Sequence, residues 1–172
     1  MKTKNYKGFM LVEVLLYVAV LTIIITVVGS FFLWIVRSNT KARVTRETLD
    51  NSRRAIETMT YEIKEAKSIY SPTADSNQLS LETIKYLPDG EEISYIDFFL
   101  CGDNLCMKKE SEDPIALTSD QVEVSELVFT QIATGTVPSI QIDLKIDYKN
   151  PNNRQEYQSS VETVSTVSMR SY

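Results

Sequence analysis

The sequence predicts an α+β protein in which a long N-terminal transmembrane α-helix is followed by an antiparallel β-sheet domain. Three observations lead to this prediction. A long apolar run lies near the N-terminus, no proline occurs before Pro72, and apolar and polar residues alternate regularly from Ile140 onward. We expect the C-terminal half of the helix to pack on the sheet, because each element must bury its apolar face against another.

The apolar run is a candidate membrane span. Residues 9–36 carry a single charge, on Glu13, and the 23 residues at positions 14–36 carry none. A helix of that length rises about 34 Å, enough to cross a hydrocarbon core of about 30 Å. Trp34 lies near the end of the run, where an amphipathic ring prefers the membrane interface. Gly29-Ser30 is the position at which this helix bends or packs closely most easily.

Basic residues stand on both sides of the apolar run, so the positive-inside rule does not orient it by itself. Residues 1–8 carry a charge of +3, and residues 37–67 also carry a net +3. The basic residues that directly follow the run are expected to contact the headgroups of membrane lipid. They are Arg37, Lys41 and Arg43.

The same helix is expected to continue from Phe9 to about Tyr70, a length of roughly 93 Å. In its second half, apolar and small residues recur at spacings of three and four, which places them on one helix face. We predict that this face covers the sheet. Its members are Leu49, Ser52, Ile56, Met59, Ile63, Ala66 and Tyr70.

Residues 71–77 have the composition of a loop, and strands are expected after it. The most regular strand covers residues 140–148, where Ile, Leu and Tyr alternate with polar residues at the period of two. A turn is predicted at residues 150–153, whose sequence is Asn-Pro-Asn-Asn. The other expected strands lie near residues 79–84, 91–101, 104–110, 122–130 and 157–170.

The two cysteines, Cys101 and Cys106, flank the sequence Gly-Asp-Asn-Leu. A two-residue turn at Asp103-Asn104 would place Cys101 opposite Cys106, at a Cα separation that a disulfide can bridge. An exported domain meets an oxidising compartment, so we predict a disulfide between them. The alternative is a pair of reduced, half-buried thiols.

Composition excludes several classes of function. The chain has no His and only two Cys, so a Ser-His-Asp or Cys-His catalytic group and a Cys-rich zinc site cannot be built. We predict no catalytic residues, no enzyme activity and no cofactor. No metal site is predicted either, since Asp103-Asn104 and Glu112-Asp113 do not match a calcium loop. Residues 68–172 hold seven basic and seventeen acidic side chains, which argues against nucleic-acid binding by this domain.

Three interpretations of residues 1–36 compete. A cleaved secretory signal has an apolar core of about 7–15 residues, which is shorter than this run. A simple signal anchor fits the length but leaves the carboxylate of Glu13 inside the apolar run without a purpose. The third interpretation is a processed leader followed by an assembly helix, and it accounts for Glu13.

The third interpretation rests on the sequence of residues 7–16, Lys-Gly-Phe-Met-Leu-Val-Glu-Val-Leu-Leu. A short basic leader ends in Gly8, the bulky Phe9 follows, and Glu13 is the fifth residue after Gly8. This pattern, with the apolar helix behind it, resembles the class III leader of type IV prepilins and type II secretion pseudopilins.

The resemblance implies how the N-terminus is processed. A prepilin peptidase would cut between Gly8 and Phe9 on the cytoplasmic side of the membrane and then N-methylate Phe9. Glu13 would pair with the N-terminal amine of an adjacent subunit and set the axial register of a filament. The alternative for Glu13 is an interfacial carboxylate that the helix dipole favours in the first turns.

The resemblance also implies a fold, a location and partners. The fold would be pilin-like, in a single-pass inner-membrane protein with a cytoplasmic N-terminus and an extracytoplasmic β domain, assembled after processing into a type IV pilus or a type II secretion pseudopilus. Its partners would be prepilin peptidase, other pilin or pseudopilin subunits, the inner-membrane assembly platform and membrane lipid. The implied segments are a leader at residues 1–8, a transmembrane assembly half-helix at 9–36, an amphipathic half-helix at 37–70 and an antiparallel β domain at 71–172.

A weaker resemblance concerns the subfamily. The chain is similar to the J-type minor pseudopilins and the W-type minor pilins at residues 53–69, at Leu117-Thr118-Ser119, Val124 and Leu127-Val128-Phe129, and at the ending from Val164 to Arg170. This resemblance implies a priming or tip subunit. The chain departs from many type IV pilins, because Gly29-Ser30 stands where those have a proline that kinks the helix. A filament-tip adhesin, a DNA-uptake binding module and a signal-anchored domain that is not processed are the alternatives.

Overall fold

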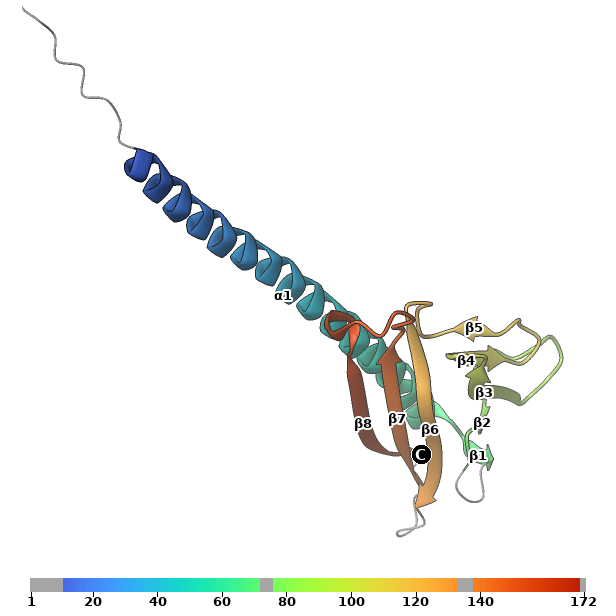
Figure 1. Cartoon of the computed structure of the whole chain (residues 1–172). Helices are drawn as coiled ribbons and strands as arrows, with labels where there is room; N and C mark the ends of the chain where they lie inside the picture. Colours follow the sequence, from blue (N-terminus) through green and yellow to red (C-terminus); the bar gives the residue numbers. More distant parts are fainter. Residues whose placement is uncertain (1–10, 72–75, 133–137, 171–172) are drawn as a thin grey trace, which may run out of the picture. The chain divides into compact units, whose positions relative to one another are not determined.

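A computed structural model describes residues 11–71, 76–132 and 138–170 of the chain (Figure 1). Helix α1 (Leu11–Glu65) is followed by an all-antiparallel β region, so the predicted α+β layout is confirmed at that level. The chain divides into two compact units, Met1–Thr40 and Lys41–Tyr172.

The β region contains two sheets rather than the single sheet expected from the sequence. The first has five strands in the order β1-β2-β3-β4-β5, and the second has three in the order β6-β7-β8. The strands are β1 (Ser68–Ser71), β2 (Leu79–Thr83), β3 (Ser94–Cys101), β4 (Asn104–Lys109), β5 (Ile115–Ala116), β6 (Val122–Ile132), β7 (Ser139–Tyr148) and β8 (Ser160–Ser168).

The prediction that the helix reaches Tyr70 is wrong, because α1 ends at Glu65 and the chain turns into strand β1. The backbone N–H of Lys67 donates to the carbonyl of Glu82 at 2.8 Å, which starts the pairing of β1 with β2. Two side-chain contacts hold the same junction: Ser68 Oγ donates to Glu82 Oε2 at 2.7 Å, and Lys67 Nζ lies 2.9 Å from Glu82 Oε1. Strand pairing therefore outweighs the helical spacing that continues through this segment.

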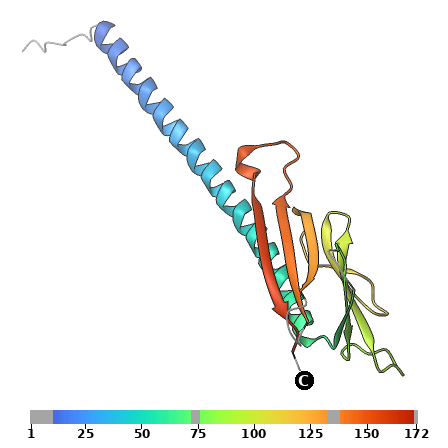
Figure 2. The same cartoon turned by 90° about the horizontal axis from the view of Figure 1, so that it is seen from below.

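The C-terminal part of α1 runs alongside the three-stranded sheet (Figure 2). It shares one hydrophobic core with both sheets. Met59 and Ile63 of the predicted face are fully buried, and so is Ala55, which was not among the predicted members. Leu49 and Tyr70 are exceptions to that prediction, since they are 52% and 71% exposed. From the sheets, the core receives Leu79, Leu81, Ile96, Phe98, Phe129, Ile140, Ile142, Leu144 and Ile146, among others.

Strand β7 confirms the clearest alternation in the sequence. Its residues Ile140, Ile142, Leu144 and Ile146 are all fully buried, and the intervening polar residues lie on the other face. Strands β1 and β5 were not predicted, because four and two residues are too short to show a period. In the described part of the predicted loop at residues 71–77, Ser76 pairs its backbone with Phe129 of β6.

The end of the chain follows the predicted order with one addition. The turn expected at residues 150–153 is present, and Asn150 holds it by exchanging side-chain hydrogen bonds with the backbone of Arg154. A short 3-10 helix (Gln155–Tyr157) then precedes the last strand, so β8 begins at Ser160 and not at Tyr157.

Candidate functional site

The first candidate site is the apolar segment of α1, residues 11–36. By length and composition this helix is able to cross a membrane, and none of its most apolar stretch is buried by the chain itself. Leu11 is 79% exposed and Trp34 is 64% exposed, so the apolar surface extends over the whole segment. An apolar surface of this extent marks a membrane or protein contact.

Hydroxyl side chains inside the segment donate hydrogen bonds to backbone carbonyls of the same helix. Thr22 Oγ1 donates to the carbonyl of Val18 at 2.8 Å, Thr26 Oγ1 to that of Thr22 at 2.8 Å, and Ser30 Oγ to that of Thr26 at 2.9 Å. Hydroxyls that bond to the carbonyl four residues back need no water, which suits an apolar environment. The sequence indicates these hydrogen bonds, because Thr22, Thr26 and Ser30 are four residues apart. Helical structure continues through Gly29 and Ser30.

Glu13 is the single acidic or basic residue among the described residues up to Val36. It lies in the first turn of α1, and Tyr17, one turn later, donates a hydrogen bond from its hydroxyl to Glu13 Oε1 at 3.3 Å. Within the part of the chain that the structure describes, no cation lies within ion-pair distance of Glu13. The predicted processing residues Gly8 and Phe9 lie outside the described residues.

The second region, beginning at Lys41, places the rest of α1 by specific polar contacts. The backbone N–H of Ser119 donates to Asn51 Oδ1 at 2.9 Å, and Asn51 Nδ2 donates to the carbonyl of Glu47 at 2.8 Å. At the next residue of the helix, Ser52 Oγ and Thr163 Oγ1 of β8 are hydrogen bonded at 2.8 Å. Since Asn51 and Ser52 are almost fully buried, these bonds fix the rotation of the helix against the sheet.

Two carboxylates near the end of α1 have opposite environments. Burial raises the pKa of Glu62, although the hydroxyl of Tyr86 donates to its Oε1 at 3.3 Å. Glu65 has a lowered pKa, because Lys85 donates a hydrogen bond to it and Arg170 adds a second positive charge. The two nitrogen–oxygen distances are 3.0 Å to Lys85 and 2.7 Å to Arg170. The helix end is thus bound to the loop after β2 and to the segment after β8.

The two cysteines form the predicted disulfide, with a Cα separation of 5.8 Å. The predicted register is wrong, because the turn is formed by Gly102 and Asp103 rather than by Asp103 and Asn104. Cys101 pairs with Asn104 and Cys106 pairs with Phe99, so the cysteines are diagonal neighbours on one face. Gly102 has a φ of +69°, and a two-residue hairpin of this type favours glycine at its first turn position.

Of the residues considered for calcium, Asp103 and Asn104 have other contacts. Asp103 Oδ2 forms an ion pair with Lys149 Nζ at 3.1 Å, and Asn104 Nδ2 donates to Asp120 Oδ1 at 3.4 Å. Asp103 also accepts, through its backbone carbonyl, the N–H of Val124 at 2.8 Å. These contacts tie the β3–β4 hairpin to the second sheet.

Comparison of the chain with protein-family models, with curated proteins and with solved structures found no match.

Proposed function

We propose that this protein is a minor pilin or pseudopilin subunit. In this account the apolar helix inserts into the cytoplasmic membrane, prepilin peptidase removes residues 1–8 and N-methylates Phe9, and the subunit is added to a type IV pilus or type II secretion pseudopilus. Its position would be that of a priming or tip subunit, on an assembly platform of the inner membrane.

The observation that carries the proposal is the contrast between Glu13 and its surroundings. A carboxylate in an apolar, membrane-compatible helix costs free energy unless a partner neutralises it, and such groups usually have a function. The described residues offer Glu13 only the hydroxyl of Tyr17, which is neutral. Cleavage after Gly8 would create an amine at Phe9, four residues before Glu13, and the same amine on a neighbouring subunit would be a cationic partner.

The exposed surface of residues 11–36 supports the same proposal. A membrane anchor alone explains an apolar helix. It does not explain a carboxylate within the apolar run, whereas helix packing in a filament supplies both an apolar environment and a partner for the charge. The folded β region supplies the extracytoplasmic part that remains outside the membrane before assembly.

The proposal is tested by Glu13→Gln in the full chain, expressed in its own cells. We expect the variant to remain in the membrane, while its recovery in the sheared filament fraction and its cross-linking to other pilin-like subunits fall at least about tenfold, as the loss of one charged hydrogen bond predicts. Glu57→Gln is the matched control, because Glu57 is an exposed carboxylate later on the same helix. Assembly of Glu13→Gln at the wild-type level would contradict the proposal.

A further inference from the structure

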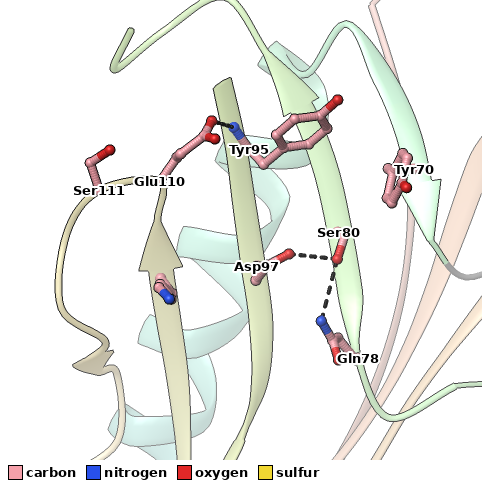
Figure 3. Close-up of a pocket in the computed structure, with 8 residues that line it drawn as sticks. Tyr70, Gln78, Ser80, Tyr95, Asp97, Glu110 and Ser111 are labelled. Atoms are coloured by element: carbon pink, nitrogen blue, oxygen red, sulfur yellow. Dashed lines mark hydrogen bonds between the residues drawn. The ribbon is translucent and has the colours of Figure 1, made fainter. Parts of the chain in front are cut away.

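A hollow of about 450 Å³ lies on the five-stranded sheet, on the side opposite the hydrophobic core (Figure 3). Along β2 and β3, Leu81 and Ile96 point into the core, so their neighbours Ser80, Tyr95 and Asp97 belong to the other face. Its residues come from β1 to β4 and from the segment just after β4.

Strand register aligns polar groups across the floor of the hollow. Ser80 of β2 is opposite Asp97 of β3, which in turn is opposite Lys108 of β4. Ser80 is only 6% exposed, and its hydroxyl donates to Asp97 Oδ1 at 2.5 Å while accepting from Gln78 Nε2 at 3.4 Å. This chain of hydrogen bonds fixes the Asp97 carboxylate and leaves its second oxygen available to a ligand.

Two tyrosines form an aromatic wall beside these polar groups. The rings of Tyr70 and Tyr95 meet edge to face, with centroids 5.5 Å apart and planes at 65°. Tyr70 is 71% exposed, so its ring offers an open apolar surface. Glu110 Oε2 accepts the backbone N–H of Tyr95 at 3.1 Å, which leaves its other oxygen as a further acceptor. In the described part of the chain, neither tyrosine hydroxyl has a hydrogen-bond partner.

The geometry points to a binding site for a neutral saccharide. A sugar ring presents C–H groups on its faces, which pack on an aromatic ring, and hydroxyls on its rim, which both donate and accept hydrogen bonds. The hollow matches both surfaces, with Tyr70 and Tyr95 for the ring face, Asp97 and Glu110 as acceptors and Lys108 as a donor.

The charges in the hollow argue against other ligand classes. The two carboxylates, Asp97 and Glu110, outnumber the single ammonium of Lys108, so a phosphate or carboxylate ligand would meet net repulsion. A cationic ligand would meet the ammonium of Lys108, which has no carboxylate within ion-pair distance among the described residues, so no ion pair offsets its repulsion of a cation. A fully apolar ligand would leave the charged groups without water or partners.

Saturation-transfer NMR on the full chain tests this proposal directly. The protein is held in a polyoxyethylene ether detergent, which carries neither sugar nor ammonium groups. The probes are neutral trisaccharides built from glucose, galactose and N-acetylglucosamine, with inorganic phosphate and tetramethylammonium as the anionic and cationic alternatives. We expect at least one trisaccharide to bind, and neither ion to bind or displace it.

Variants locate the bound sugar. Asp97→Asn keeps an acceptor for Ser80 but removes the charge, and Tyr70→Ala removes the exposed ring, so each is expected to weaken binding by about tenfold. Tyr70→Phe keeps the ring and should bind within about twofold of wild type, and Asp143→Asn on β7 of the other sheet is the control for charge. Absence of binding by all three trisaccharides, affinity unchanged in both weakening variants, or preferential binding of either ion would overturn the proposal.

Discussion

Residues 11–36 and residues 41–170 differ in what determines their structure. Among the described residues, the polar side chains of the first segment form hydrogen bonds along its own helix, and nearly all of its apolar side chains are exposed. In the second region, the same helix is fixed by Asn51, Ser52 and a core that includes strands of both sheets. The second region therefore specifies its own fold, whereas the exposed apolar surface of the first requires cover from lipid or from other protein. That requirement is the physical basis for regarding the first segment as the functional one.

The largest difference between the two regions is expected when one aromatic side chain is removed from each and the free energy of unfolding is measured. Phe129 is fully buried, so Phe129→Ala is expected to lower the free energy of unfolding of the β region by about 3–5 kcal/mol. Phe32 is 64% exposed, and Phe32→Ala should leave that free energy unchanged. Denaturant unfolding of the full chain in detergent, followed by the circular dichroism of the sheets, measures both. Equal losses in the two variants would mean that the regions are not independent.

A smaller effect is expected from the disulfide. The Cys101–Cys106 bridge closes a loop with a sequence separation of 5, so the loss of loop-closure entropy in the unfolded chain amounts to about 2 kcal/mol. The double variant Cys101→Ser/Cys106→Ser should lose about that much stability in the same unfolding experiment. Its behaviour in the membrane should match that of wild type, since the bridge lies in the second region. A double variant that no longer stays in the membrane would contradict the independence of the two regions.

The smallest effect concerns pH. Burial raises the pKa of Glu62 in the folded state, so protonation of this carboxyl favours folding. The contribution of Glu62 to the free energy of unfolding therefore falls as the pH rises from the pKa of Glu62 in the unfolded chain to its higher pKa in the folded protein. Glu62→Gln keeps an acceptor for Tyr86 and removes this penalty, so its stability relative to wild type should rise over that pH range and then level off. The gain should be a fraction of the disulfide effect.

Unfolding of wild type and Glu62→Gln from acidic to neutral pH checks this expectation. Glu57→Gln is the matched control on the exposed side of the same helix. A wild-type protein that instead gains stability relative to Glu62→Gln as the pH rises would show that Lys85 and Lys109 outweigh the burial of the carboxylate.

Local patterns in the sequence were sufficient for much of the fold. The alternation of Ile140 to Ile146 predicted β7, and the spacing of Ser52, Met59 and Ile63 predicted the buried side of the helix. The predicted helix end failed at Tyr70, because the pairing of β1 with β2 depends on Glu82, which is far along the chain. The spacing of apolar residues in the helix does not indicate that strand pairing competes with helix formation at residues 66–70.

The candidate sites divide in the same way. Glu13 was identified from the sequence, because a single charge within an apolar run can be recognised without knowing the fold. The hollow on the five-stranded sheet was not found, because Ser80, Asp97 and Lys108 come together only through strand register. The cysteine pair lies between these cases, since the spacing gave the disulfide, whereas Gly102 rather than Asn104 determined the turn.

The central claim is that α1 serves in assembly after a leader ending at Gly8 has been removed. Its most direct test is the intact mass and N-terminal peptide of the protein isolated from its own membranes. We predict a chain that lacks residues 1–8 and carries one added methyl group on the amine of Phe9. An intact Met1 terminus would indicate an ordinary signal anchor, and a terminus near Ser30 would indicate a secreted domain. Either result would contradict the account, because Glu13 would then have no N-terminal amine at Phe9 to pair with.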